Sequence, residues 1–120
     1  MSTRSLIPLV AVLVAAVAFP VSAGASATQD CQLQISTLRA ATAAATSFVN
    51  SKDQAGLLGK LDNSSAALTA GKNADAVQKL TDFRTKVQAL GSNGKLGAED
   101  AARLDAEAAA AIGCIQSSST

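Results

Sequence analysis

Apolar side chains recur at helical spacing from residue 28 onward. Between residues 28 and 49 the intervals alternate between four and three, in a stripe that is apolar except for Thr42: Cys31, Ile35, Leu38, Thr42, Ala45 and Val49. Residues at these intervals lie on one face of an α-helix. We therefore predict a first helix over residues 28–49, with Phe48 widening the far end of its apolar face.

Residues 51–90 predict a helical hairpin. Its apolar positions are Leu57, Leu61 and Leu68 in the first arm, then Ala76, Leu80, Phe83, Val87 and Leu90 in the second. Ser51, followed three residues later by Gln54, is a capping-box pattern and marks the start of the first arm. Gly71 suits the left-handed conformation that ends a helix, and Asn73 is expected to cap the second arm.

A glycine-rich loop and a fourth apolar stripe complete the pattern. The third helix is expected to end at Leu90, because residues 91–94 have the composition of a loop. The fourth helix should run from an N-cap at Gly97 to Gly113. Its apolar positions are Ala101, Leu104, Ala108, Ala111 and Ile115. The polar residues 116–120 are predicted to form a disordered tail.

The composition favours helices throughout. Aromatic and β-branched residues are too sparse for a sheet, with three Phe and no Trp or Tyr, while alanine and leucine are strong helix formers. Four helices joined by short loops predict an all-α, up-down-up-down four-helix bundle, formed as one domain by residues 28–115. On the helix surfaces, acid-first pairs four residues apart predict intrahelical ion pairs: Asp75–Lys79, Asp82–Lys86 and Glu99–Arg103.

Residues 1–27 are predicted to be a signal peptide. Arg4 precedes an apolar run over residues 6–19, and small residues then allow cleavage after Ala23 or, with the better A-x-A match, after Ala27. The apolar run is shorter than the roughly 20 residues that a membrane span needs. We therefore expect a secreted protein that retains no membrane span after cleavage.

The two cysteines fall at opposite ends of the predicted bundle sequence. Cys31 lies at the start of the first helix and Cys114 at the end of the fourth, and an up-down-up-down topology brings those two ends to the same pole. In a secreted chain this predicts a structural disulfide. Closing so long a loop is expected to stabilise the fold by about 4–5 kcal/mol. A redox thiol would need a C-x-x-C pair or a neighbouring base, and the sequence has neither at these positions.

The sequence offers little for catalysis. It contains no histidine, nucleophile elbow, phosphate-binding glycine loop or zinc-ligand spacing, so we expect no catalytic, cofactor-binding or metal-ligating residues. The aromatic residues beyond the leader, Phe48 and Phe83, lie on or beside core stripes, which argues against base or sugar stacking. Without Arg4 the chain has nine basic and nine acidic residues. Its net charge is therefore close to zero, and no nucleic-acid partner is expected.

The stretch from Ser51 to Ile115 resembles the FIMAH domain, a small helical module found mainly at the C-termini of secreted bacterial proteins. The resemblance is carried by core and cap residues: Leu57-Leu58, Lys60-Leu61-Asp62, Ala66-Ala67-Leu68, Ala70-Gly71, Asn73, Ala76-Val77, Leu80, Phe83, Val87 and Lys95-Leu96. Arg84 stands where that family usually has an apolar residue, and Gly97 replaces a usual Ser cap. The resemblance implies a non-catalytic accessory module and supplies no ligand or active-site residues.

Three functions remain open at this point. The preferred prediction is a secreted interaction module that binds another protein or a cell-envelope component, and an exposed patch including Leu58 and Val77 would favour it. The alternative is a small-ligand carrier or enzyme inhibitor, which a cavity lined by Thr42, Ser64 and Ser65 would favour. Ser64 occupies a core position, where it either lines such a cavity or only packs. An enzyme would require convergent acids in a cleft.

Overall fold

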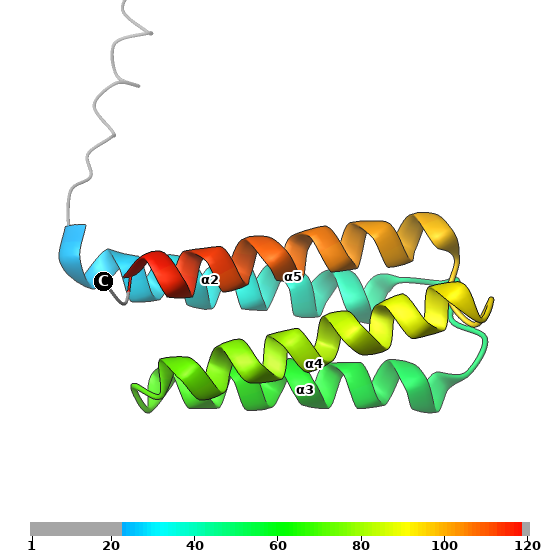
Figure 1. The fold of residues 1–120 in the computed structure, drawn as a ribbon, viewed down its shortest axis with the longest axis horizontal. Helices are drawn as coiled ribbons and strands as arrows, with labels where there is room; N and C mark the ends of the chain where they lie inside the picture. The colour runs from blue at the N-terminus through cyan, green and yellow to red at the C-terminus, as the bar shows by residue number, and fades with distance from the viewer. Residues whose placement is uncertain (1–22, 119–120) are drawn as a thin grey trace, which may run out of the picture.

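The computed structural model describes residues 23–118, which fold into four consecutive helices without a strand (Figure 1). In chain order these are α2 (Ala23–Ala44), α3 (Ser51–Thr69), α4 (Asn73–Ser92) and α5 (Ala98–Ser118). Residues 1–22, which hold the apolar run of the predicted signal peptide, lie outside the described part, as do the last two residues of the predicted tail.

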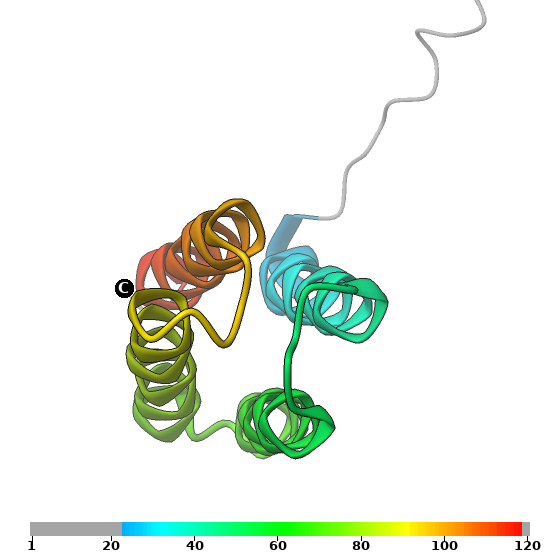
Figure 2. The same cartoon turned by 90° about the vertical axis from the view of Figure 1, so that its right-hand side faces the viewer.

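The helices form the predicted up-down-up-down bundle. Viewed from its end, the bundle places one helix at each corner of a square (Figure 2). Each helix packs against the two helices at adjacent corners, so α2 contacts α3 and α5, while α4 contacts the same two helices from the opposite corner. The all-α four-helix architecture is therefore confirmed.

The predicted apolar stripes meet along the bundle axis. Phe83, Leu57, Leu61, Leu80 and Leu104 are fully buried in one continuous core. Alanines also occupy core positions, and Ala76, Ala108 and Ala111 are completely buried. Burial of these side chains is the main stabilising contribution, because each large aliphatic or aromatic side chain gains about 1.5–3 kcal/mol on leaving water.

The first helix ends earlier than predicted. α2 stops at Ala44, so the predicted end at Val49 is wrong, and the Val49 side chain is 73% exposed. The Gln54 side-chain amide turns back to this helix end and donates hydrogen bonds of 2.9–3.3 Å to three carbonyl groups, those of Thr42, Ala43 and Ala45. These bonds satisfy carbonyls that a helix terminus leaves unpaired. At its other end α2 begins at Ala23, upstream of the predicted residue 28.

Two predicted caps are shifted by one residue. Asn50, not Ser51, caps α3, and its side chain accepts a 2.8 Å hydrogen bond from the Lys52 amide. The capping-box prediction fails because Gln54 bonds to α2 and not to its own helix start. At the start of α4, Lys72 takes the N-cap position in place of the predicted Asn73.

The last two helices run further than predicted. α4 continues to Ser92 and α5 passes through Gly113 to Ser118, so residues 116–118 are helical and not part of a disordered tail. Glycine costs a helix interior about 1 kcal/mol relative to alanine. Tertiary anchoring outweighs that cost here, because Ile115 is fully buried and Cys114 is covalently bound.

A disulfide joins Cys31 to Cys114, as predicted. The two Cα atoms are 5.6 Å apart and 83 residues apart in sequence. The bond ties α2 to the end of α5 at the pole where the α3–α4 turn also lies (Figure 1).

The opposite pole is held by hydrogen bonds between the two connecting segments. Ser47 Oγ donates to Asp100 Oδ2 at 2.6 Å and accepts a bond from the Gly97 amide at 3.0 Å. The Val49 amide also donates to the Lys95 carbonyl at 3.0 Å. Both ends of the α2–α5 pair are thus fixed, one by a covalent bond and one by a polar cluster.

Candidate binding surface on helix α2

The exposed apolar residues are not those that the sequence suggested. Leu58 and Val77 are half-buried, and Val77 packs against the core, so the exposed patch around them that would favour an interaction module does not form. The large hydrophobic side chains that stand exposed in the described part of the chain are Leu33, at 63%, and Val49.

The cavity lined by Thr42, Ser64 and Ser65 that would favour a ligand carrier does not form either. Thr42 is fully buried and its hydroxyl donates to the Leu38 carbonyl at 2.8 Å. Ser64 is also fully buried and donates to the Ala76 carbonyl at 3.1 Å, so it packs α3 against α4. Only Ser65 reaches a surface groove.

Leu33 stands between two grooves that flank α2. The groove between α2 and α3 has a volume of about 430 Å³, and the residues that line it include Gln32, Leu33, Ile35, Arg39, Leu61, Asp62 and Ser65. The groove between α2 and α5 has a volume of about 260 Å³ and is lined by Leu33, Gln34, Thr37, Glu107 and Ala110. A single exposed leucine therefore forms part of both walls.

The polar side chains along the α2–α3 groove are paired with one another. Gln32 donates to the Ser65 carbonyl at 3.1 Å and to Thr69 Oγ1 at 2.8 Å, and it accepts a 2.7 Å bond from the Ser65 hydroxyl. Arg39 Nε lies 2.6 Å from Asp62 Oδ1. The hydrogen bond from Arg39 lowers the pKa of Asp62 below its usual value, against an opposing effect of burial.

Beside the α2–α5 groove, in contrast, one carboxylate oxygen of the described residues has no hydrogen-bond partner. Glu107 is half-buried, and within the described residues its Oε1 atom is buried without any hydrogen-bond partner. Buried polar atoms are almost always paired, so such an exception calls for an explanation. Sequence reasoning missed both Leu33 and Glu107. The available signal was that Leu33 lies off the apolar stripe, between Cys31 and Ile35.

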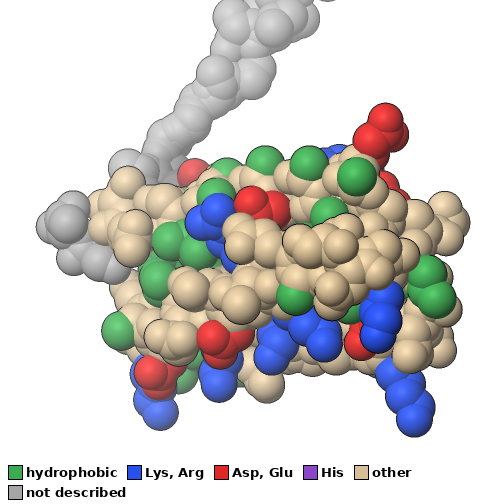
Figure 3. Space-filling model, turned by 45° about the vertical axis from the view of Figure 1, so that its right-hand side comes forward, with side chains coloured by type: hydrophobic (Ala, Val, Ile, Leu, Met, Phe, Trp, Pro, Cys, Tyr) green, Lys and Arg blue, Asp and Glu red, His purple; other side chains and the backbone are tan. Residues whose placement is uncertain are grey.

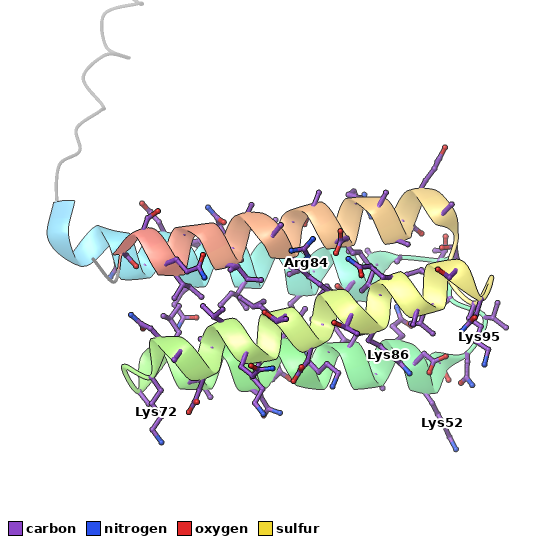
Figure 4. The ribbon with its side chains drawn as sticks, in the orientation of Figure 1. Lys52, Lys72, Arg84, Lys86 and Lys95 are labelled. Atoms are coloured by element: carbon purple, nitrogen blue, oxygen red, sulfur yellow. A yellow bond between two sulfur atoms is a disulfide. The ribbon has the colours of Figure 1, made fainter. Side chains whose placement is uncertain are left out.

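Arg84, the departure from the FIMAH pattern, is explained by an ion pair between helices. It reaches from α4 toward α5, where its Nε lies 2.8 Å from Asp105 Oδ1 (Figure 4). Gln88 donates to the same oxygen at 3.1 Å. The Arg84 hydrogen bond lowers the pKa of Asp105, and the bond from Gln88 acts in the same direction, while burial opposes them.

Gly97, the second departure, is required by the contact with Ser47. A Cβ atom at position 97 would lie 2.8 Å from Ser47 Oγ and 2.9 Å from Ser47 Cβ. A serine cap would meet the same obstruction.

Charges of both signs are interleaved on the face of the bundle drawn in Figure 3. The face in Figure 3 shows acidic and basic side chains side by side and small, separate hydrophobic patches. The predicted intrahelical pairs are wrong: Lys86 lies 3.6 Å from Asp53 on the neighbouring helix, Arg103 pairs with Asp100, and no ion pair joins Asp75 to Lys79 in the described chain.

Residues 23–118 contain no cluster of three or more side chains suited to hold a metal ion. None of their helices combines the length and the apolar character required to cross a bilayer. Comparison with family models gives no match, and comparisons with curated proteins and with solved structures give none either.

Proposed function

We propose that this protein is a secreted, non-catalytic interaction module that binds a partner protein or cell-envelope component through the outer face of α2. The observation that carries the proposal is the 63% exposure of Leu33 between two grooves on a helix fixed at both ends. Covering a leucine of this kind in an interface gains up to about 1.5–3 kcal/mol.

The neighbouring residues on α2 suit close approach by a partner. Ser36, Thr37 and Ala40 are exposed, small and uncharged, so a partner helix can lie near the α2 backbone without burying an unpaired charge. The disulfide and the Ser47–Asp100 contact hold α2 against α5, so little ordering cost is expected on binding.

Secretion is supported by two independent features. Residues 1–27 have the sequence pattern of a leader, and a disulfide suits an oxidising compartment. The resemblance to FIMAH domains supports an accessory role without catalysis.

Site-specific photocrosslinking tests the proposal. A photoreactive residue replaces Leu33 in the secreted, oxidised chain, and the control replaces Thr85, which is exposed on α4 at the diagonal corner of the bundle. Incubation with envelope and secreted proteins of the producing cell is followed by mass spectrometry. We expect one partner to be crosslinked from position 33 and not from position 85. Equal yields from both positions, or no product, would contradict a binding face on α2.

The alternative function, a small-ligand carrier or inhibitor, has one favouring observation. The α2–α3 groove has a volume of about 430 Å³ over the apolar side chains of Ile35 and Leu61, within the range of about 300–1,000 Å³ typical of ligand pockets. Its polar side chains are already paired with one another, which leaves a ligand few free groups to bind. The interaction module is therefore preferred.

A further inference from the structure

The turn between α4 and α5 contains an asparagine–glycine pair, Asn93 and Gly94, that the proposed function does not use. The pair lies next to Lys95, at the pole opposite the disulfide (Figure 4). Residues 92–95 are all exposed, so water reaches both members of the pair. A Cβ atom at Gly94 would meet no atom within 4 Å, which leaves room for a reaction at this peptide bond.

The reaction open to such a pair is the loss of the side-chain amide. The Gly94 nitrogen gives up its proton and bonds to Cγ of Asn93, the Cγ–Nδ2 bond breaks, and ammonia leaves. Water then opens the resulting five-membered imide at one of its two carbonyl carbons. The product is either aspartate or isoaspartate, in which the backbone runs through the former side chain. A following glycine favours the first step because it has no Cβ to obstruct ring closure.

In the native turn the attacking nitrogen is not yet in position. Asn93 has φ at −87° and ψ at 1°, so the Gly94 nitrogen eclipses the Asn93 nitrogen and is turned away from the Asn93 Cβ. The Gly94 amide also donates a hydrogen bond to the Gly91 carbonyl. At 3.3 Å this is the longest of the backbone hydrogen bonds in the turn, and therefore the easiest to break.

Glycine at position 94 allows a local movement that brings the nitrogen into position. Its φ is +75°, and glycine adopts negative φ as readily as positive φ. Opposite rotations of ψ at Asn93 and of φ at Gly94 flip the peptide between them and leave the flanking chain in place. The flip breaks the 3.3 Å hydrogen bond, while the 2.8 Å bond from the Lys95 amide to the Leu90 carbonyl is kept.

The other three asparagines of the chain lack these features. Asn50, Asn63 and Asn73 are each followed by serine or alanine, whose Cβ obstructs ring closure. The Asn50 side chain is already bonded to the Lys52 amide. Asn63 lies within α3, where helical hydrogen bonding holds the next backbone amide.

We propose that Asn93 is a site of spontaneous deamidation in the folded protein, reached by a flip of the Asn93–Gly94 peptide without opening of the bundle. The isoaspartate product lengthens the backbone next to Lys95, whose carbonyl accepts the 3.0 Å bond from the Val49 amide. The modification therefore loosens the pole at which hydrogen bonds hold the end of α2 to the start of α5. This inference does not depend on the proposed function.

Incubation of the full secreted, oxidised chain in water enriched in heavy oxygen tests the proposal, because each conversion takes one oxygen atom from the solvent. Digestion in ordinary water and peptide mapping then locate the label. The reference is the acetylated and amidated peptide of residues 91–96 in the same buffer, which has no fold to open. Because the flip breaks one neutral hydrogen bond, we expect Asn93 to be labelled no more than about tenfold more slowly than the peptide.

The controls are the other asparagines and one variant. Asn50, Asn63 and Asn73 should stay unlabelled over the same period. Asn93→Gln keeps an amide at the same exposed position but would need a six-membered ring, which closes far more slowly, so the label at position 93 should disappear.

The outcomes separate the proposal from its alternatives. No label at Asn93 while the peptide converts, or labelling slower than about a tenth of the peptide rate, would show that the fold protects this pair and would overturn the proposal. Equal labelling at Asn63 would also overturn it. Amide hydrogen exchange of the isolated isoaspartate form should be faster at Lys95 and Leu96 than in the unmodified protein, and unaltered exchange would contradict a loosened pole.

Discussion

Two aspartates of the bundle pair with arginine in different surroundings. The Asp105 side chain is 25% exposed and lies between α4 and α5, whereas that of Asp62 is 56% exposed at the edge of a groove. Water screens the second pair more strongly, so the first should contribute more to stability. The pKa of both carboxyl groups is lowered by the arginine hydrogen bond.

The lowered pKa of Asp105 predicts a pH-dependent contribution to stability. The stabilisation is complete above the unfolded-state pKa, near 4, and is lost as the pH falls through the lower folded-state value. Asp105→Asn should therefore reduce the free energy of unfolding by up to about 1 kcal/mol at pH 7 and by less at about pH 2. Urea denaturation at both pH values measures this difference.

Asp62→Asn serves as the comparison. Because the Asp62 side chain is more exposed to solvent, this substitution should lower the free energy of unfolding at pH 7 by less. A loss for Asp105→Asn that is the same at both pH values would show that the ionised carboxylate is not its cause.

At the scale of the helix, two glycines in and next to α5 have different surroundings and different roles. Gly97 precedes the helix and lies against Ser47, while Gly113 lies inside the helix with open space around the position of a Cβ. The first is required by packing. Gly113 only weakens the helix, because glycine loses more backbone entropy on folding than other residues do.

These surroundings predict opposite effects of alanine. Gly97→Ala should destabilise the protein by about 1–3 kcal/mol, because its Cβ would overlap Ser47 and displace the bonds to Asp100. Gly113→Ala should stabilise it by about 0.5–1 kcal/mol. Thermal and urea unfolding of the two variants provides the measurement, and a change of the same sign in both would be inconsistent with this explanation.

At the scale of the whole molecule, the disulfide closes almost the entire bundle into one loop. Many of the positions where the helices meet are alanines, such as Ala76, Ala108 and Ala111, which bury little area each. A small core of this kind supplies only about 3–5 kcal/mol. The disulfide, whose two cysteines are 83 positions apart in sequence, therefore contributes a large share of the free energy of unfolding.

Removal of the disulfide by Cys31→Ser with Cys114→Ser should lower the free energy of unfolding by about 4–5 kcal/mol in the chain-entropy account. The last turns of α5 should lose protection first, because the covalent anchor at Cys114 is then gone from the helix beyond Gly113. Denaturation and amide hydrogen exchange test both statements. A variant as stable as the oxidised protein would show that packing alone carries the fold.

The sequence by itself determined the local features of this protein. Apolar spacing predicted four helices and nearly all of their buried residues, and Gly71, with φ at +79°, ends α3 as expected. The pairing of Cys31 with Cys114 followed from topology alone. These features depend on residues close in sequence, or on the order in which the helices follow one another.

The tertiary structure decided what depends on contacts between distant residues. α2 ends at Ala44 because Gln54 caps it from the next helix, and α5 passes Gly113 because Cys114 and Ile115 are anchored. The candidate surface has the same origin. Leu33 and Glu107 belong to different helices, and the groove that they share exists only because the bundle sets those helices side by side.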